Sequence, residues 1–269
     1  MGSGTTFKEI STKKFAAIQV KIPFLAEQER IVMRIEELFS RLDNSVNELK
    51  KAKERLKVYR QAVLKEAFRG VTRKALIREM SISVTSGSRG WAKYYSNKGA
   101  RFIRITDLTR DRILLKSDNI QYVELPEKIE GKRSRLKKND VLVSITADLG
   151  SIGFIADEMK EAYINQHIAM IRFKNTEQGE YMAWYLKSDF GQKDLLKNKR
   201  GGGKLGLGLE DIRNTMVPVV DDKIAFDTVE KINRQLSVCD NIEQTVDTAL
   251  QQAEALRQSI LKKAFEGGL

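Results

Sequence analysis

The feature that most constrains the fold of this chain is an internal repeat. Residues 60–70, RQAVLKEAFRG, reappear as RQSILKKAFEG at 257–267, with seven of the eleven positions identical and an offset of 197. The same offset pairs Ile35 with Ile232 and Asp43 with Asp240. The repeats of a solenoid adjoin one another, whereas these two copies stand far apart. They therefore frame a different domain that lies between them.

Each copy of the repeat ends a stretch that predicts a long helix. Apolar residues recur at steps of three or four, at Ile31, Ile35, Leu38, Leu42, Val46, Leu49, Ala52, Leu56, Tyr59, Val63 and Ala67 in the first copy and at Val229, Ile232, Leu236, Cys239, Ile242, Val246, Ala249, Ala253, Leu256, Ile260 and Ala264 in the second. This spacing, with a mean near 3.5 residues, is typical of a coiled-coil seam. Neither stretch contains Pro or Gly, and Gly70 and Gly267 stand where glycines end helices.

A helix of about 40 residues is about 60 Å long. Its narrow apolar stripe needs a partner, which is a globular core, the other copy of the repeat, or a copy of the repeat in a partner chain. Helices that pack on the core of a compact domain are usually much shorter. Because both copies carry similar stripes, we expect them to pair antiparallel and to act as a rigid spacer.

The region between the copies has a different character. Runs rich in β-branched and aromatic residues at 101–105, 140–145 and 168–173 predict strands, and 180–196 predicts a helix. The predicted fold class is therefore α+β: one globular domain with a mixed or antiparallel sheet, flanked by two long helices that pair as an antiparallel coiled coil. The predicted boundaries are an N-terminal segment at 1–25, helices at 26–70 and 222–269, and the globular domain at 71–221; residues 1–4 resemble an expression-tag remnant.

The charge of the chain points to a polyanion partner. The net charge is +12, and residues 71–221 hold 27 Lys and Arg against 19 Asp and Glu. A basic domain favours nucleic acid first and an acidic membrane surface second. Three loops, at 85–95, 146–150 and 199–208, combine hydrogen-bonding or cationic side chains with glycines. Lys and Arg neutralise phosphates, and polar side chains read base edges.

We therefore predict a DNA contact set within these loops and at two further places, residue 104 and residues 165–167. Its members are Ser88, Arg89, Trp91, Lys93, Tyr94, Arg104, Thr146, Asp148, Asn165, Gln166, His167, Lys199, Arg200 and Lys204. Structural alternatives stand beside these assignments. Trp91 with Tyr94 and Tyr95 can pack under their own loop, the glycine-rich loop can be a plain turn, and His167 can be a satisfied polar group. The basic run 132–138 is typical of a solvated face.

Several function classes find no support in the sequence. The single Cys239 rules out an internal disulfide and fits a reducing cytosol. No apolar run is long enough to span a bilayer. Pro23, Pro126 and Pro218 are isolated, so the Asn/Asp-Pro-Pro-Tyr/Phe motif expected of an amine methyltransferase is absent. No phosphate-binding G-x-x-x-x-G-K-[ST] motif is present, and one Cys and one His make no zinc site.

Two rival functions remain. Asp118 with Glu130-Gly131-Lys132 loosely fits a metal-dependent nuclease pattern, although such a pattern often arises by chance in a charged chain. A coiled-coil scaffold that binds protein or RNA without sequence preference would explain the helices, but it would leave the basic central domain without a task.

The frame and the central domain together resemble the specificity subunit of type I restriction-modification systems. The similar segments are IPFLAEQERIV at 22–32, the two repeat copies, and within the central domain 85–95, 102–108, 144–150, 163–168 and 200–209. The resemblance implies a non-catalytic, cytoplasmic subunit that reads DNA and directs partner methyltransferase and restriction subunits. It implies that this chain holds no metal or cofactor, and that the partners use S-adenosylmethionine, ATP and Mg²⁺.

The family alternates two recognition domains with two helical regions, and this chain departs from that pattern. Only 71–221 resembles a complete recognition domain, while Thr6–Pro23 resembles the tail of another. We therefore expect a half-subunit or a truncated form that reads a half-target or pairs as a homodimer. The residues expected to bind the methyltransferase are Glu27, Gln28, Arg60, Gln61, Phe68, Arg257, Gln258 and Phe265. Asp221–Phe226 departs from the Glu-Gln-Arg-Ile-Val pattern of the first helix, so we expect weaker docking there.

Overall fold

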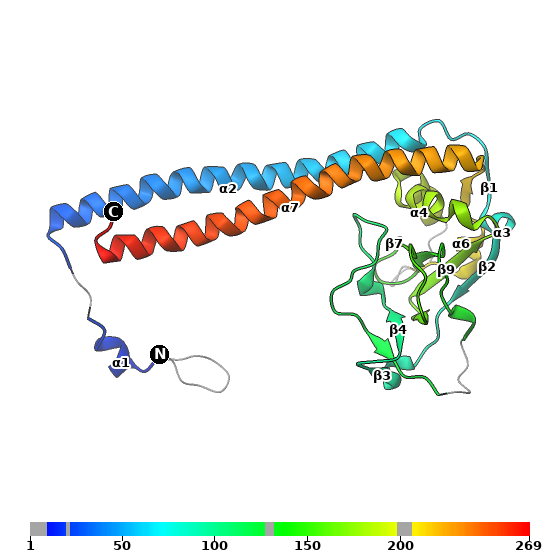
Figure 1. Cartoon of the computed structure of the whole chain (residues 1–269), viewed down its shortest axis with the longest axis horizontal. Helices are drawn as coiled ribbons and strands as arrows, with labels where there is room; N and C mark the ends of the chain where they lie inside the picture. Colours follow the sequence, from blue (N-terminus) through cyan, green and yellow to red (C-terminus); the bar gives the residue numbers. More distant parts are fainter. Residues whose placement is uncertain (1–9, 20–21, 127–131, 198–205) are drawn as a thin grey trace. The chain divides into compact units, whose positions relative to one another are not determined.

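A computed structural model describes residues 10–19, 22–126, 132–197 and 206–269 of the chain (Figure 1). It divides into two compact units. Unit 1 comprises Met1–Glu54 and Ile242–Leu269, and unit 2 comprises Arg55–Asn241. Each unit contains part of both long helices, so the division falls within the helices rather than at their ends. No helix in the described residues is long and apolar enough to cross a membrane.

The two long helices form where the sequence predicts them. Helix α2 spans Leu25–Phe68 and helix α7 spans Asp222–Glu266, 44 and 45 residues respectively. The absence of Pro and Gly lets each run unbroken for about 66 Å. Apart from Tyr59, Ile242 and Leu256, the predicted apolar stripe is half-buried or buried along both helices. The coiled-coil seam is therefore confirmed at nearly every position.

Contacts within unit 1 show that the helices run antiparallel (Figure 1). Lys53 Nζ lies 2.7 Å from Asp247 Oδ1, near the start of the α7 part of this unit. Arg257, further along α7, pairs with Asp43, which comes earlier in α2. Arg30, near the start of α2, donates a 2.6 Å hydrogen bond to the backbone carbonyl of Leu269. Residues progressively earlier in α2 thus contact residues progressively later in the chain from α7 onward, as expected for the predicted antiparallel pairing.

The prediction is wrong at one repeated position of the seam. Tyr59 and its repeat equivalent Leu256 are 48% and 51% exposed. The next residue in each helix, Arg60 or Arg257, faces the partner helix instead. Each arginine pairs with an aspartate there, Arg60 with Asp240 and Arg257 with Asp43. The carboxylate on the partner helix provides an opposite charge that an apolar stripe does not reveal.

The described residues of unit 2 form three small sheets. Strands β2 (Ser81–Ser86), β9 (Ile168–Phe173), β6 (Val141–Ser144) and β7 (Ile152–Phe154) form one antiparallel sheet in that order. Strands β3 (Tyr95–Ser96), β5 (Tyr122–Val123), β4 (Ala100–Ile103) and β8 (Ala162–Ile164) form a mixed sheet in which β4 and β8 are parallel. Strands β1 (Lys74–Leu76) and β10 (Met216–Pro218) pair antiparallel. The predicted α+β class is confirmed.

Short helices complete unit 2. The α-helices are α3 (Ile77–Met80), α4 (Gly179–Lys187), α5 (Asp189–Leu196) and α6 (Leu209–Arg213). The 3₁₀ turns are η1 (Trp91–Tyr94), η2 (Ile105–Asp107), η3 (Lys132–Ser134) and η4 (Thr176–Gln178). Residue 188 separates α4 from α5, because the Ser188 side chain caps α5 by accepting from the Gly191 amide. The helix predicted at 180–196 is therefore two helices.

The end of α2 is part of the unit 2 core. Phe68 packs edge-on against Tyr181 and Tyr185 of α4, with ring centroids 5.3 and 5.4 Å away. Val63 and Leu64 join the same apolar cluster, which also holds Ile232 and Leu236 of α7. The first copy of the repeat thus packs on the other helix along one side and on the globular domain at its end.

The second copy of the repeat and the N-terminal segment differ from this arrangement. Phe265, the equivalent of Phe68, is 77% exposed in unit 1. Helix α1 (Thr12–Ala16) stands at the same offset of 197 from α6, but none of its residues is buried. Ile212 of α6 is fully buried, whereas its equivalent Phe15 is exposed. The offset of 197 therefore also relates the short helices α1 and α6. The two helices differ in burial, because α6 packs into a core and α1 does not.

Candidate nucleic-acid interface

Five separate segments of the sequence meet around one concave site of unit 2. This cationic cavity, as we call it, has a volume of about 660 Å³. It is lined by Ser86, Gly87, Ser88, Arg89, Gly90, Trp91, Lys93, Tyr94, Arg133, Ile145, Thr146, Gln166 and Leu207. Seven of the predicted contact residues lie in this lining, namely Ser88, Arg89, Trp91, Lys93, Tyr94, Thr146 and Gln166. The structure thus brings together three of the segments that the sequence analysis singled out.

A close backbone contact fixes the first of these loops. Ser88 pairs with Asn165 in a parallel bridge beside the turn between β8 and β9. A Cβ atom on Gly87 would lie 1.9 Å from the carbonyl oxygen of Ile164, so the two chain segments can only approach this closely at a glycine. Asn165 is buried, and its Oδ1 accepts from the His167 amide at 3.1 Å. Asn165 therefore supports the turn rather than facing the cavity.

Trp91 anchors the same loop from beneath. Its ring is 4% exposed and packs edge-on against Tyr163 at 5.2 Å and tilted against Phe102 at 5.8 Å. Burial, together with the hydrogen bond to Glu161, raises the pKa of Tyr163 to about 12, so this phenol stays neutral. Trp91 is therefore a packing residue, as the structural alternative in the sequence analysis held. It also forms part of the cavity lining.

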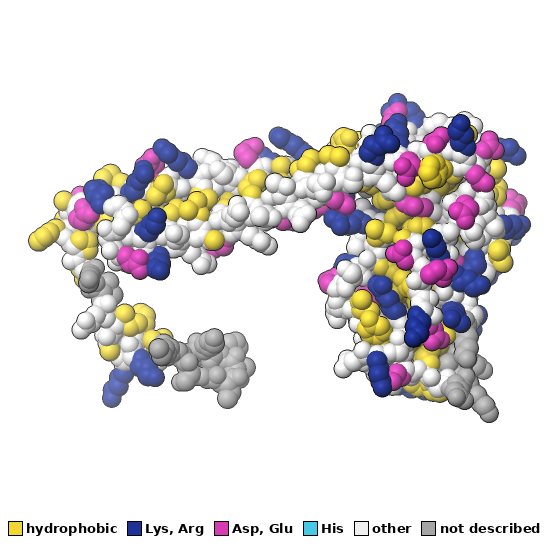
Figure 2. Space-filling view, viewed as in Figure 1, with side chains coloured by type: hydrophobic (Ala, Val, Ile, Leu, Met, Phe, Trp, Pro, Cys, Tyr) yellow, Lys and Arg dark blue, Asp and Glu magenta, His cyan; other side chains and the backbone are white. Residues whose placement is uncertain are grey.

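The cavity carries positive charge, and the described part of its lining contains no carboxylate to offset it. Arg89, Lys93 and Arg133 are exposed, and Lys93 Nζ lies 5.0 Å from the Tyr94 ring centroid. None of the described residues that line the cavity is Asp or Glu. On the face of unit 2 drawn in Figure 2, basic and acidic side chains lie interspersed. The acid-free lining is therefore a local feature and not a consequence of net charge alone.

Arg133 is a functional candidate that the sequence analysis missed. It belongs to the basic run 132–138, which is typical of a solvated face. Its Nε lies 3.3 Å from Thr85 Oγ1 of β2, which brings it to the wall that Arg89 and Lys93 share. The run itself gave no signal that one of its members faces the 85–95 loop.

A polar chain joins Thr146 to Gln166 through the single histidine. Thr146 Oγ1 lies 2.6 Å from His167 Nδ1, and Gln166 Nε2 lies 3.0 Å from His167 Nε2. If the Gln166 amide donates to Nε2, the neutral ring carries its proton on Nδ1 and donates it to Thr146. Both ring nitrogens are then satisfied, and His167 holds two cavity residues in place. His167 is thus a polar group whose hydrogen bonds are satisfied within the chain, which is the alternative stated in the sequence analysis. Its role is to position Thr146 and Gln166.

Arg104 and Asp148, two further predicted contact residues, lie outside the cavity lining. Arg104 donates to the Asn119 carbonyl at 2.8 Å and does not line the cavity. Asp148 lies on the loop after β6, where it pairs with Arg110. Burial alone would raise the pKa of Asp148, but hydrogen bonds from Ser151 and Arg110 and the nearby charges of Arg110 and Lys187 lower it. Lys199, Arg200 and Lys204 lie outside the described residues.

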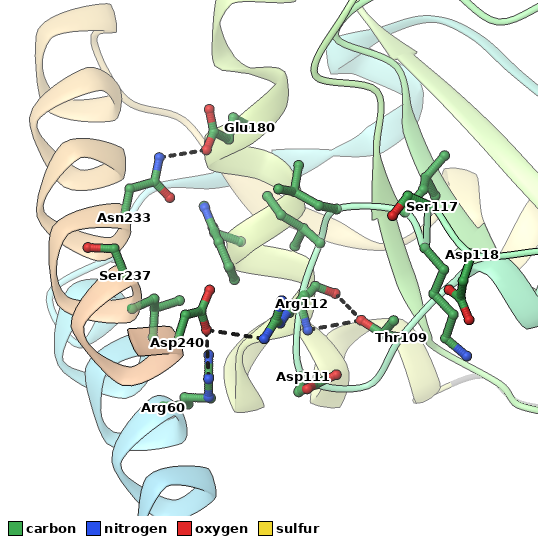
Figure 3. Close-up of a pocket in the computed structure, with 16 residues that line it drawn as sticks. Arg60, Thr109, Asp111, Arg112, Ser117, Asp118, Glu180, Asn233, Ser237 and Asp240 are labelled. Atoms are coloured by element: carbon green, nitrogen blue, oxygen red, sulfur yellow. Dashed lines mark hydrogen bonds and ion pairs between the residues drawn. The ribbon is translucent and has the colours of Figure 1, made fainter. Parts of the chain in front are cut away.

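A second cavity of unit 2, about 700 Å³ in volume, has mixed charge (Figure 3). It lies between the 109–118 segment and helices α4 and α7. Asp240 contacts Arg60 at 2.7 Å and Arg112 at 3.5 Å, and Asn233 donates to Glu180 at 2.8 Å. Asp111 and Asp118 add two further carboxylates. These carboxylates would repel phosphates, so the cationic cavity is the better candidate for binding nucleic acid.

The nuclease pattern is not assembled in the described part of the chain. Asp118 lines the mixed-charge cavity, while Glu130 and Gly131 lie outside the described residues and nothing is described of the Lys132 side chain. Among the described residues, no group of three or more His, Cys, Asp or Glu is placed to hold a metal ion.

The residues predicted to bind a methyltransferase fall into two sets. Arg60 and Phe68 are buried inside unit 2, whereas Gln61 and Gln258 are exposed. Glu27, Gln28 and Phe265 line an apolar groove of about 500 Å³ in unit 1, together with Ile22, Ile31 and Val32. Arg257 sits over the Phe39 ring at 4.6 Å. Gln61, Gln258 and the groove residues are therefore the members of the predicted set that a partner can reach.

Comparisons with known proteins agree with this architecture. The family model for the type I restriction modification DNA specificity domain matches residues 88–252. The EcoBI specificity subunit of Escherichia coli is 25% identical over 99% of this chain and 62% of its own length. The StySPI specificity subunit of Salmonella potsdam is 25% identical over 100% of this chain and 61% of its own length.

Two solved structures share the fold. One chain in a structure concerning complex assembly and conformational transition of the type I R-M system superposes with a TM-score of 0.77 at 20% identity, over 99% of this chain and 66% of that one. The HsdS subunit from Thermoanaerobacter tengcongensis gives a TM-score of 0.53 at 18% identity, over 99% and 65% respectively.

The matched region covers more than half of the chain, including the cationic cavity from Ser88 to Leu207. Fold and sequence together define an α+β domain joined to two long helices. The chain belongs to the family of type I restriction modification DNA specificity domains. It spans 61–62% of the length of the E. coli and Salmonella relatives named above.

Proposed function

We propose that this chain is the sequence-specific DNA-recognition subunit of a type I restriction-modification complex. The observation that carries the proposal is the cationic cavity, where loops far apart in the sequence meet and where none of the described lining residues is a carboxylate. Membership of the specificity-domain family supports it. The scaffold alternative leaves this cavity without a role, because a spacer needs no concave cationic site.

The cavity supplies both kinds of contact that DNA reading needs. Arg89, Lys93 and Arg133 bind phosphates or guanine edges, and neutralising phosphates releases counterions. Ser88, Thr146 and Gln166 offer hydroxyl and amide groups to base edges. The Gln166 amide keeps its oxygen and one N–H free when its other N–H donates to His167. This leaves a donor and an acceptor side by side, which is the pattern that reads adenine.

The proposed partners act around this chain. Modification subunits dock on the helix pair and carry S-adenosylmethionine, and a restriction subunit that uses ATP and Mg²⁺ joins them. The chain itself contributes recognition and no chemical step. The apolar groove of unit 1, with Glu27, Gln28 and Phe265 at its edge, is the proposed site of contact with a partner subunit or with a second copy.

A DNA selection from a random library tests the proposal, with the full chain alone and with its cognate methyltransferase, at moderate salt. We expect one short enriched motif if a single recognition domain acts alone. Two inverted motifs at fixed spacing would indicate two copies acting together. No enrichment while the methyltransferase is demonstrably bound would overturn the proposal and leave an assembly scaffold.

A further inference from the structure

The loop between β6 and β7, residues 145–151, reaches the cationic cavity through Ile145 and Thr146. Ala147 at its tip has φ = 56°, in the left-handed region that residues other than glycine rarely adopt. Such a conformation is strained for a residue with a side chain and persists only where the surroundings hold it. The question is therefore which residues hold this loop.

Arg110 makes the contacts that hold the loop tip. Its Nε lies 2.8 Å from Asp148 Oδ1, its Nη2 contacts the same oxygen, and Nη2 also donates to the Leu149 carbonyl at 2.8 Å. The other carboxylate oxygen, Asp148 Oδ2, accepts from Ser151 Oγ at 2.6 Å. Both oxygens of Asp148 are thus used within the chain. A base edge would have to displace one of these partners to be read by Asp148.

The segment that carries Arg110 is itself anchored to the core. Lys187, the last residue of α4, is 7% exposed and donates to the Thr109 carbonyl at 2.8 Å. Thr109 also forms a bridge with Ile152 of β7. From α5, Gln192 donates to the Gly150 carbonyl at 2.9 Å. The loop is therefore fixed at both ends and at its tip to the rigid part of unit 2.

We propose that Arg110 is a positioning residue for DNA recognition, which holds the Asp148 carboxylate and so places Thr146 against the cationic cavity. This inference rests on the proposed function. Arg110 does not line the cavity, although its side chain is 56% exposed. The alternative role for an exposed arginine is a direct phosphate contact. The two roles differ in what they do to sequence preference and to salt dependence.

The test compares wild type with Arg110→Ala, Asp148→Ala and the double variant, with Arg101→Ala as the control. Arg101 is an arginine of the same domain that donates to the Lys116 carbonyl and does not contact the loop. The measurements are affinity for the selected motif and for random DNA, each over a range of salt. The double variant also removes the unpaired carboxylate that Arg110→Ala leaves near DNA.

We expect both single variants to lower the ratio of motif to random affinity at least tenfold, and the double variant to lower it no further. The salt slope of the double variant should match wild type. An unchanged ratio with a salt slope reduced by about 1 would overturn the proposal in favour of a phosphate contact. Additive losses would also overturn it, since they would mean that each residue reads DNA by itself.

A measurement without DNA separates this inference from the proposed function. The Gly150 amide donates to the Ser144 carbonyl at 3.0 Å, and the Ser151 amide donates to Ser144 Oγ at 2.8 Å. In Arg110→Ala these amides should exchange with solvent at least tenfold faster, and in Arg101→Ala they should not. Unchanged exchange would overturn the positioning role even where wild type selects a motif. A wild type that selects no motif would overturn the proposed function, and the DNA part of this inference with it.

Discussion

Arg60 of α2 and Asp240 of α7 form an ion pair at 2.7 Å, and Arg257 and Asp43, their partners at the repeat offset of 197, form the same pair in unit 1 (Figure 3 shows the first). The repeat therefore preserves a contact between the helices as well as a sequence. The surroundings differ, because the Arg60 side chain is 6% exposed and that of Arg257 is 33% exposed.

This difference predicts unequal costs for the same substitution. Asp240→Asn leaves the buried Arg60 with a weaker acceptor and should lower the free energy of unfolding by about 1–3 kcal/mol. Asp43→Asn, at the exposed pair, should cost less than about 1 kcal/mol. Urea unfolding of both variants provides the measurement. Equal costs would show that burial of the arginine does not set the strength of the pair.

The two repeat phenylalanines provide a matched pair for packing. Phe68→Ala removes a ring that is buried between Tyr181 and Tyr185, and should cost about 3–5 kcal/mol of unfolding free energy. Phe265→Ala removes an exposed ring and should change it by less than about 0.5 kcal/mol. Thermal or urea unfolding of the full chain distinguishes the two. Similar losses would contradict the burial difference between the two copies.

Lys187 should give stability a distinctive dependence on pH. Burial, partly offset by Asp111 and Asp148, lowers its pKa from 10.5 to about 8. Between these values the unfolded chain binds more protons than the folded chain, so stability rises with pH through this window. Relative to Lys187→Met, wild type should gain up to about 1.4 kcal/mol per pH unit from about pH 8 to about pH 9.5. Parallel curves for the two proteins would show that the folded lysine titrates normally.

Each cation of the cavity should contact either a phosphate or a base. The dependence of DNA affinity on salt concentration distinguishes the two roles. Loss of a phosphate contact in Arg89→Ala, Lys93→Ala or Arg133→Ala should weaken binding to all sequences and reduce the salt slope by about 1. Loss of a base contact should cost about 1–3 kcal/mol on the selected motif alone. Lys98→Ala, an exposed lysine paired with Glu124, is the control. Any of the three variants that behaves like this control would be removed from the interface.

Gly87 should tolerate no side chain. A methyl group there would overlap the Ile164 carbonyl oxygen and push the 85–95 loop away from the β8–β9 turn. Gly87→Ala should therefore weaken selection of the motif, as measured by competition with random DNA. Gly70→Ala is a matched control, because a Cβ on Gly70 would have nothing within 4 Å and its φ is not positive. Normal selection by Gly87→Ala would show that the loop can move without loss of recognition.

The sequence allowed the prediction of features that repeat or that depend on local pattern. The spacing of apolar residues located both helices and their antiparallel seam, and β-branched runs located three of the longer strands. The apolar spacing wrongly placed Tyr59 and Leu256 in the seam. The adjacent arginine faces the partner helix instead, because it pairs with an aspartate about 200 residues away in the sequence. Only the fold supplies that proximity.

The cavity shows the same limit. Sequence reasoning identified Ser88, Arg89, Thr146 and Gln166 as loop residues with suitable chemistry, and the structure brings them to one wall. It missed Arg133, because a basic run looks the same whether one member faces a loop or all face solvent. It also did not anticipate the pairing of Asp148 with Arg110, because the two residues are 38 positions apart in the sequence.

The contrast between the cationic cavity and the apolar groove makes the two units depend on different properties of an added salt: the cavity on its ionic strength, and the groove on the identity of its anion. Added electrolyte weakens cation–phosphate attraction at the cavity. Sulfate and other anions that are excluded from protein surfaces strengthen apolar association. In a sulfate solution, the groove with its exposed Phe265 should therefore associate more strongly with other apolar surfaces. Chloride and sulfate at equal ionic strength should thus give similar DNA affinities but different tendencies of the purified chain to self-associate.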